Sequence, residues 1–235
     1  MKIGIIGAMP EEVAGLCSHM EQVTETTVAG MTFYEGLLEG REVVVVQSGV
    51  GKVNAGICAQ LLADRFKAGC VINTGIAGSL KNEIDIGDIV ISEDAVQHDV
   101  EATTWGYAPG QIPGMAETVF PADEALIDLA EKVCRKVNPD IRVWRGRIAS
   151  GDQFITDAAD KQRIIDTFHA LCTEMEGAAV AQVCRRNQIP FVILRAISDK
   201  ADGSAVADNN TFTDEVLRRN DRLIRGMCTH SQYDG

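Results

Sequence analysis

Short segments, most of them largely apolar, alternate with helical patterns, and this alternation constrains the fold of this chain more than any other feature. The strand-like segments span residues 2–8, 70–74, 87–92, 143–150 and 191–197. The helical patterns span residues 53–66, 123–137, 157–168 and 211–229. Strands without alternating polar residues are usually covered on both faces, and their alternation with helices is typical of α/β folds. We therefore expect one α/β domain over residues 1–235, with a parallel or mixed central sheet.

Residues 22–48 depart from this pattern, because apolar and polar residues alternate there. The expected strands are Thr27–Ala29, Met31–Leu38 and Glu42–Ser48. Gly30 and Gly40 lie between them, which predicts antiparallel strands joined by glycine turns. A second glycine pair lies in Gly75–Ser79, where we expect a turn after the preceding strand.

The composition excludes several classes of protein. Thirty-four acidic residues against 22 Lys and Arg give a net charge of −12, which argues against nucleic acids and anionic membranes as partners. No segment approaches the length of about 18 apolar residues that a membrane-spanning helix needs. The apolar start is too short and too soon acidic for a signal peptide, and the seven scattered cysteines include no Cys-x-x-Cys pair. These features predict a cytoplasmic protein with reduced thiols.

Two familiar kinds of site fit the sequence poorly. The glycines around Lys52 suggest a phosphate-binding loop, but Val46 and Val53 stand where that loop requires glycine and Ser or Thr. Acidic residues also raise the possibility of a Mg²⁺ or Ca²⁺ site, yet no EF-hand or Asp-rich loop is present and His98 beside Asp99 is isolated. A metal site is therefore the weaker alternative.

Four carboxylates are expected to meet at one edge of the sheet. Glu12 follows the first strand, Glu174 and Glu176 lie at a strand-to-helix junction, and Asp199 ends the last strand. Carboxyl ends of strands are where α/β folds bind ligands. Arg195, Ile197 and Asp199 should share one face of the last strand because side chains alternate. A purely structural interpretation also exists, in which Glu176 complements the dipole of the following helix.

Clustered carboxylates suit the cleavage of a glycosidic bond. That reaction passes through a positively charged sugar, and it needs an acid for the leaving group and a base that directs a nucleophile to the opposite face. Negative charge around the sugar would stabilise the cation.

Five motifs in order resemble the 5′-methylthioadenosine/S-adenosylhomocysteine nucleosidases, nearly from end to end. They are Met1–Glu12, Asn73–Gly78, Ser150–Ile155, Glu174–Ala179 and Arg195–Asp199. The resemblance implies the nucleoside phosphorylase type of fold, a three-layer α/β sandwich with a twisted mixed sheet. It also implies a homodimer that uses no cofactor or metal and hydrolyses the N-glycosidic bond of these nucleosides.

The resemblance also implies a role for each matched residue. Asp199 would protonate the departing adenine, oriented by Ser198, while Glu12 activates water with help from Arg195. The residues implied for ribose are Met175, Glu176 and Glu174. Those implied for adenine are Phe154, Ile155, Ala77, Gly78 and Ser198. Taken singly, Phe154 is more often a core residue and Arg195 more often an ion-pair partner.

The end of the site that would hold the 5′ substituent is less well matched. The residues implied there are Met9, Val50, Trp105, Tyr107, Pro113 and Phe212. The family often has Ser at Ile76 and Phe at Trp105, and it usually has a larger apolar residue at Ala102. Part of the loop 98–114 would reach across the dimer, because long loops in compact domains are usually functional or at interfaces. Residues 203–210 do not align cleanly.

Two rival functions remain open. A purine nucleoside phosphorylase would share the fold but needs cationic groups for phosphate, typically arginines, and the segments around Glu12 and Asn73–Thr74 contain no arginine. A non-catalytic nucleoside sensor would have lost Glu12 or Asp199, and both are present. The sequence does not distinguish methylthioadenosine, S-adenosylhomocysteine, 5′-deoxyadenosine and aminodeoxyfutalosine as the preferred substrate.

Overall fold

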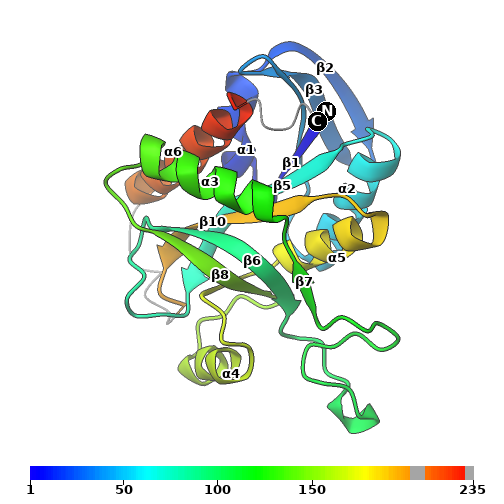
Figure 1. The fold of residues 1–235 in the computed structure, drawn as a ribbon, viewed down its shortest axis with the longest axis vertical. Helices are drawn as coiled ribbons and strands as arrows, with labels where there is room; N and C mark the ends of the chain where they lie inside the picture. Colours follow the sequence, from blue (N-terminus) through cyan, green and yellow to red (C-terminus); the bar gives the residue numbers. More distant parts are fainter. Residues whose placement is uncertain (202–209, 231–235) are drawn as a thin grey trace.

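The computed structural model describes residues 1–201 and 210–230, except for the side chains of residues 210–213 (Figure 1). The strands are β1 Ile3–Gly7, β2 Glu21–Val28, β3 Met31–Leu38, β4 Arg41–Gln47, β5 Cys70–Ser79, β6 Ile89–Gln97, β7 Val119–Pro121, β8 Val143–Ser150, β9 Cys172–Glu174 and β10 Phe191–Asp199. The helices are α1 Pro10–Ser18, α2 Lys52–Asp64, the 3₁₀ turn η1 Thr103–Trp105, α3 Glu124–Val137, α4 Ala158–Phe168, α5 Gly177–Asn187 and α6 Asn210–Cys228.

The strands form one mixed sheet in the order β10-β6-β8-β9-β5-β1-β4-β3-β2, with β7 paired to β6. β10 also pairs with β5, so β10, β6, β8, β9 and β5 form a closed circuit of paired strands. The antiparallel strands β2, β3 and β4 extend the sheet beyond β1, in the stretch where the sequence predicts them. β5 therefore lies where the closed and open parts of the sheet meet.

Helices cover both faces of the sheet, which gives three layers (Figure 1). On one face α2 and α5 pack together with apolar side chains of the sheet, including Val44, Val71 and Ile193. On the other face α1, α3 and α6 enclose a second core that includes Ile5 and Leu194. β1, β5 and β10 contribute to both cores because their successive side chains point in opposite directions.

Local sequence signals account for the starts of several helices. Pro10 occupies the first turn of α1, where a missing N–H costs nothing. Asp123 caps α3 by accepting from Leu126 N at 3.0 Å, and Asp157 caps α4 by accepting from Ala159 N at 2.8 Å. The predicted helices therefore agree with the observed ones to within one or two residues.

The expected turn at Gly75–Ser79 is wrong, because β5 continues through this segment. Gly75 pairs with Arg195 of β10, and Gly78 pairs with both Asp199 of β10 and Thr173 of β9. The glycines allow side chains of neighbouring elements to approach the strand closely, so their role is access rather than a bend. The short strand β7 was not predicted either.

Among the described residues, no helix is both long enough and apolar enough to cross a lipid bilayer.

Candidate active site

A pocket of about 500 Å³ opens at the carboxyl ends of β1, β5, β9 and β10. Of the residues proposed from the sequence, those that line it are Met9, Glu12, Val50, Ala77, Gly78, Phe154, Ile155, Glu174, Met175, Glu176, Ser198 and Asp199. The acids that the sequence placed at separate strand ends thus meet in one cavity. Arg195 lies directly behind this cavity wall, and its side chain is 1% exposed.

Glu12 is held at one side of the pocket by backbone groups. Its Oε2 accepts from Ala8 N at 2.6 Å and from Met9 N at 3.0 Å, and its Oε1 accepts from Ile76 N at 3.0 Å. Three N–H donors suit an ionised carboxylate, which can only accept. A Cβ on Gly75 would come within 2.5 Å of Glu12 Oε1 and would also clash with Arg195 Nη1. Glycine at this position therefore lets both charged groups reach the same point.

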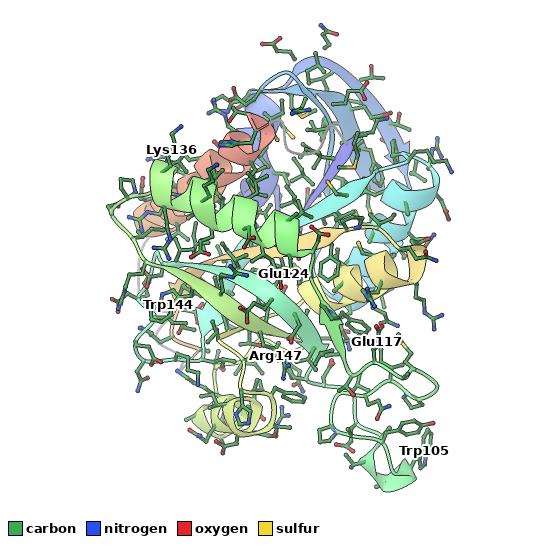
Figure 2. All side chains as sticks on the ribbon, viewed as in Figure 1. Trp105, Glu117, Glu124, Lys136, Trp144 and Arg147 are labelled. Carbon is green, nitrogen blue, oxygen red and sulfur yellow. The ribbon has the colours of Figure 1, made fainter. Side chains whose placement is uncertain are left out.

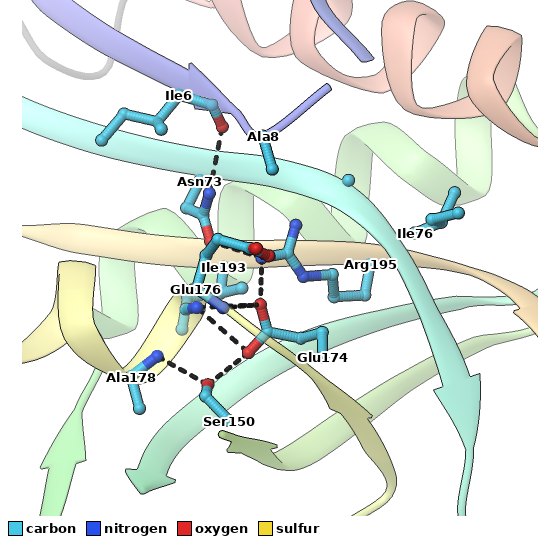
Figure 3. Close-up of polar contacts among 12 residues, drawn as sticks. Ile6, Ala8, Asn73, Ile76, Ser150, Glu174, Glu176, Ala178, Ile193 and Arg195 are labelled. Atoms are coloured by element: carbon cyan, nitrogen blue, oxygen red, sulfur yellow. Dashed lines mark hydrogen bonds and ion pairs between the residues drawn. The ribbon is translucent and has the colours of Figure 1, made fainter. Parts of the chain in front are cut away.

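Arg195 and Glu174 form a buried ion pair (Figure 3). Arg195 Nη2 also donates to Asn73 Oδ1 at 2.6 Å, and Glu176 Oε2 lies 3.9 Å away. Burial by itself lowers the pKa of Arg195, but the carboxylates of Glu174, Glu176 and Glu12 raise it above its ordinary value. The guanidinium is therefore a permanent positive charge beneath the acidic wall of the pocket.

Glu174, rather than Glu176, caps helix α5. Its carboxylate accepts from Glu176 N at 3.1 Å and Gly177 N at 2.8 Å, and it also accepts from Ser150 Oγ and Arg195 (Figure 3). A negative charge at this helix N-terminus is favourable. The structural interpretation of Glu176 as the residue that complements the dipole is therefore wrong, because Glu176 precedes the first turn as the N-cap residue.

Glu176 faces the pocket with an unusual protonation equilibrium. Its Oε1 accepts from Gly51 N at 2.9 Å, at the start of α2. Burial and then the neighbouring Glu174 carboxylate raise the pKa of Glu176 to about 7, although Arg195 and the bond from Gly51 act in the opposite direction. This carboxyl group can therefore gain or lose a proton near neutral pH.

Asp199 occupies the other side of the pocket, at the end of β10. Ser198 Oγ donates to its Oδ2 at 2.8 Å, and Ala201 N donates to its Oδ1 at 2.7 Å. The pairing of β10 with β5 slips by one residue between Ile197 and Asp199. The expected strict alternation from Arg195 to Asp199 therefore does not hold: Arg195 points to Glu174, whereas Asp199 lines the open cavity.

Phe154 and Ile155 line the pocket from the loop after β8. The ring of Phe154 is 67% exposed, so it is not part of the core that its type alone favours. Ile155 is buried in a small apolar cluster that also includes Leu80, Ala201 and side chains of α4. An exposed aromatic ring at a pocket rim is available to stack on a flat ligand.

The structure places three predicted residues outside the pocket of a single chain. Trp105, Tyr107 and Pro113 lie in the loop that projects from the body between β6 and β7, and Trp105 at its tip is 77% exposed (Figure 2). The side chain of Phe212 lies outside the described part of the chain. Their role at the 5′ substituent stays a prediction.

Several residues at the site were missed by the sequence reasoning. Asn73 orients Arg195 and donates to Ile6 O at 3.0 Å, while Ser150 bridges Glu174 and Ala178 N. Both are fully buried polar residues of the sheet: Asn73 follows the apolar run Cys70–Ile72 of β5, and Ser150 follows Ile148 and Ala149 in β8. A polar residue that directly follows such a run is the signal that could have identified them. The pocket is also lined by Ala8, Ile76, Gln153 and Thr173. Within the described ranges 1–201 and 210–230, no group of three or more His, Cys, Asp or Glu side chains could hold a metal ion.

The sequence is similar to those of known proteins. The profile of the phosphorylase superfamily matches residues 2–228. A 5′-methylthioadenosine/S-adenosylhomocysteine nucleosidase from Bacillus cereus is 45% identical over 225 residues, which cover 95% of this chain and 96% of that protein.

The fold is also similar to those of solved structures. The nucleosidase of this name from Neisseria meningitidis, in complex with methylthio-immucillin-A, superposes with a TM-score of 0.92 at 36% identity and covers 97% of this chain and 98% of that one. A futalosine hydrolase from Helicobacter pylori superposes with a TM-score of 0.90 at 32% identity, with 97% of both chains covered.

Proposed function

The chain belongs to the 5′-methylthioadenosine/S-adenosylhomocysteine nucleosidases of the phosphorylase superfamily, and from this premise we propose how its pocket performs the reaction. The chain is an N-glycosidic hydrolase that releases adenine and the 5-thio-substituted ribose from these nucleosides. The proposal concerns which side chains carry the steps of this hydrolysis, which part of the substrate each one holds and how the complete pocket is assembled.

One observation carries the mechanism: the carboxylates of Glu12 and Asp199 approach β5 at two different points, Gly75 and Gly78. Glu12 Oε1 would be 2.5 Å from a Cβ on Gly75, and Asp199 Oδ1 would be 2.8 Å from a Cβ on Gly78. Three residues of a strand span about 10 Å, so the two carboxyl groups approach β5 at well-separated points. Such a separation accommodates a sugar with a water molecule on one side and a leaving group on the other.

Asp199 acts as the general acid. As the bond between the sugar and adenine breaks, its electron pair moves to the base, and Asp199 supplies the proton that makes adenine a neutral leaving group. Ser198 fixes the carboxyl group by its hydrogen bond to Oδ2. Phe154 stacks on the purine ring, while Ala77, Gly78 and the backbone of Ile155 line the sides of the base.

Glu12 acts as the general base on the opposite side. It takes a proton from the water that attacks the sugar carbon, and Arg195 keeps a positive charge near the developing hydroxide. The carboxylates of Glu174 and Glu176 add negative charge around the sugar as it becomes cationic. Because the carboxylate of Glu174 already accepts from Ser150 Oγ, from the N–H groups of Glu176 and Gly177 and from Arg195, it acts by positioning Arg195 and α5, whereas Glu176 and Met175 hold the ribose hydroxyls.

The complete pocket requires a second copy of the chain. Val50, Val53 and Ile57 leave a row of apolar side chains exposed on and before α2, with exposed fractions of 48%, 72% and 43%. Apolar surface concentrated beside a pocket favours an interface. The projecting loop then brings Trp105, Tyr107 and Pro113 to the partner's pocket, where with Met9 and Val50 they surround the 5′-alkylthio group.

The homodimer works in the cytoplasm on a small nucleoside. All seven cysteines are free thiols, as a reducing compartment favours. The excess of 34 acidic residues over 22 Lys and Arg leaves nucleic acids and anionic membranes unfavourable as partners.

The decisive experiment is to incubate the protein with methylthioadenosine in buffers with and without phosphate. We expect adenine and free 5-methylthioribose at the same rate in both. A rate near zero without phosphate, with 5-methylthioribose 1-phosphate as product when phosphate is added, would show a phosphorylase. Tight binding without release of adenine would indicate a sensor. Comparing kcat/KM for the four candidate nucleosides would then identify the preferred 5′ substituent.

A further inference from the structure

One peptide group connects helix α6 with the carboxylate of Glu12. Asn220 Nδ2 donates to Gly75 O at 2.8 Å, and Ile76 N donates to Glu12 Oε1 at 3.0 Å. The carbonyl of Gly75 and the N–H of Ile76 belong to the same peptide plane. Asn220 and Glu12 therefore hold opposite ends of one peptide unit. Asn220 reaches it from 145 positions beyond Gly75 in the sequence.

The environment of Asn220 favours an apolar residue for stability alone. Its side chain is 3% exposed, and Val216, Leu223 and Ile224 of the same helix pack into the apolar core against the sheet. Among the described residues, Asn220 Oδ1 has no hydrogen-bond partner. An unpaired buried oxygen lowers stability, so the amide contributes through its single bond to Gly75 rather than through packing.

That single bond affects Glu12 in two ways. It fixes the rotation of the peptide plane, which determines where the N–H of Ile76 points. A hydrogen bond to a carbonyl oxygen also polarises the peptide, so its N–H becomes a stronger donor. Both effects act on the carboxylate oxygen on the side of Gly75 and Arg195.

We propose that Asn220 is a positioning residue for the hydrolysis, because it orients the Gly75–Ile76 peptide that holds Glu12 toward the attacking water. The inference rests on the proposed role of Glu12. It assigns to α6, which lines no part of the pocket among the described residues, a direct mechanical link to the catalytic base.

The test compares Asn220→Leu with Asn138→Leu. Asn138 is also fully buried and donates from Nδ2 to Arg219 O at 3.1 Å, so it joins α3 to α6 without contacting β5. We expect Asn220→Leu to lower kcat about three- to tenfold with KM changed less than twofold, as expected for one net hydrogen bond. Asn138→Leu should leave kcat within twofold even where it lowers Tm. Asn220→Ala, which cannot overpack the core, should behave as Asn220→Leu does.

A cycle with Glu12→Gln separates the possible failures. If Asn220 acts through Glu12, adding Asn220→Leu to Glu12→Gln should lower the residual rate less than twofold. Three results would overturn the inference while the function stands. They are a full kcat in a folded Asn220 variant, an equal loss of kcat in Asn138→Leu, and additive losses of kcat in the double variant. Wild-type activity in Glu12→Gln alone would instead overturn the proposed function and the inference with it.

Discussion

Arg195 and Glu174 form an ion pair that solvent does not reach, with side chains 1% and 3% exposed. Arg195 comes from β10 and Glu174 from the end of β9, and Glu174 lines the pocket. Asn73 accepts a further hydrogen bond from Arg195, and Ser150 donates one to Glu174. The electrostatics of the site are therefore built into the core of the protein rather than added to its surface.

Arg195→Met should destabilise the protein by about 3–5 kcal/mol, because it leaves the carboxylates of Glu174 and Glu176 buried without a cation. The free energy of unfolding from urea titration measures this loss. Arg135→Met is the matched control, since Arg135 is 62% exposed and pairs with Glu131 within α3. It should cost roughly 0.5 kcal/mol or less. Equal losses in the two variants would contradict the view that burial makes the Arg195 pair different.

Glu176→Gln should make stability less dependent on pH. The pKa of Glu176 is about 7 in the folded protein, against an ordinary value of 4.5, so the folded state keeps a proton that the unfolded chain has released. The free energy of unfolding of the natural protein therefore falls from pH 4.5 to 7 through this group and then levels off. Relative to it, the variant should gain on the order of 1–3 kcal/mol over that range.

Urea unfolding at pH 5, 6, 7 and 8 measures this difference. Glu131→Gln serves as the control, because the hydrogen bond from Arg135 holds the pKa of Glu131 below its ordinary value. Its stabilising contribution is present above the ordinary pKa and is lost only as the pH falls further. A constant difference between Glu176→Gln and the natural protein from pH 5 to 8 would refute the assignment.

Asp199→Asn should lower kcat for adenine release by about 10²–10⁴-fold, the range expected when a general acid is removed. Methylthioadenosine should still bind, because the change keeps the size of the side chain and the ribose contacts. Quenched-flow assay of adenine and calorimetric measurement of Kd give the two quantities. Asp166→Asn, on the exposed face of α4, should leave both unchanged. A variant at Asp199 that retained most of its activity would eliminate it as the acid.

Val53→Glu should convert the proposed homodimer to a monomer, because it places a charge where a side chain that is 72% exposed in one chain would be buried against its partner. Sedimentation velocity should show half the mass of the natural protein. Val23→Glu is the control, as Val23 is 43% exposed on β2 and β2 lies at the far end of the sheet from β10. If the natural protein itself sediments as a monomer, the proposed assembly is wrong.

Much of the fold was predictable because hydrophobic period and helix-start signals are local. Pro10, Asp123 and Asp157 placed three helices, and the apolar strands predicted a mixed sheet covered on both faces. The turn expected after residue 74 failed because a glycine that permits close approach cannot be distinguished from one that bends the chain. What Gly75 accommodates, Glu12 and Arg195, comes from elements far away in sequence.

The site residues were likewise predicted in part from the sequence. Glu12, Glu176 and Asp199 were expected at one edge of the sheet because strand ends converge there, and they do line one pocket. The sequence offered Glu176 as an acid that complements the dipole of α5, whereas the carboxylate that accepts from the first N–H groups of this helix is that of Glu174, and Glu176 as the N-cap residue makes no side-chain cap hydrogen bond. Trp105 could not be placed from one chain, because its loop points away from the body (Figure 2).

The pairing of β10 with β5 slips by one residue at Ser198, and this slip limits how β10 can be redesigned. Four steps along β10 separate Arg195 from Asp199, yet only three separate their partners Gly75 and Gly78 on β5. The extra residue, Ser198, is what releases Asp199 from the dense apolar packing that surrounds the rest of β10. Deleting one residue here would make the pairing of β10 with β5 regular, and it would bury Asp199, the proposed proton donor, where no purine could reach it.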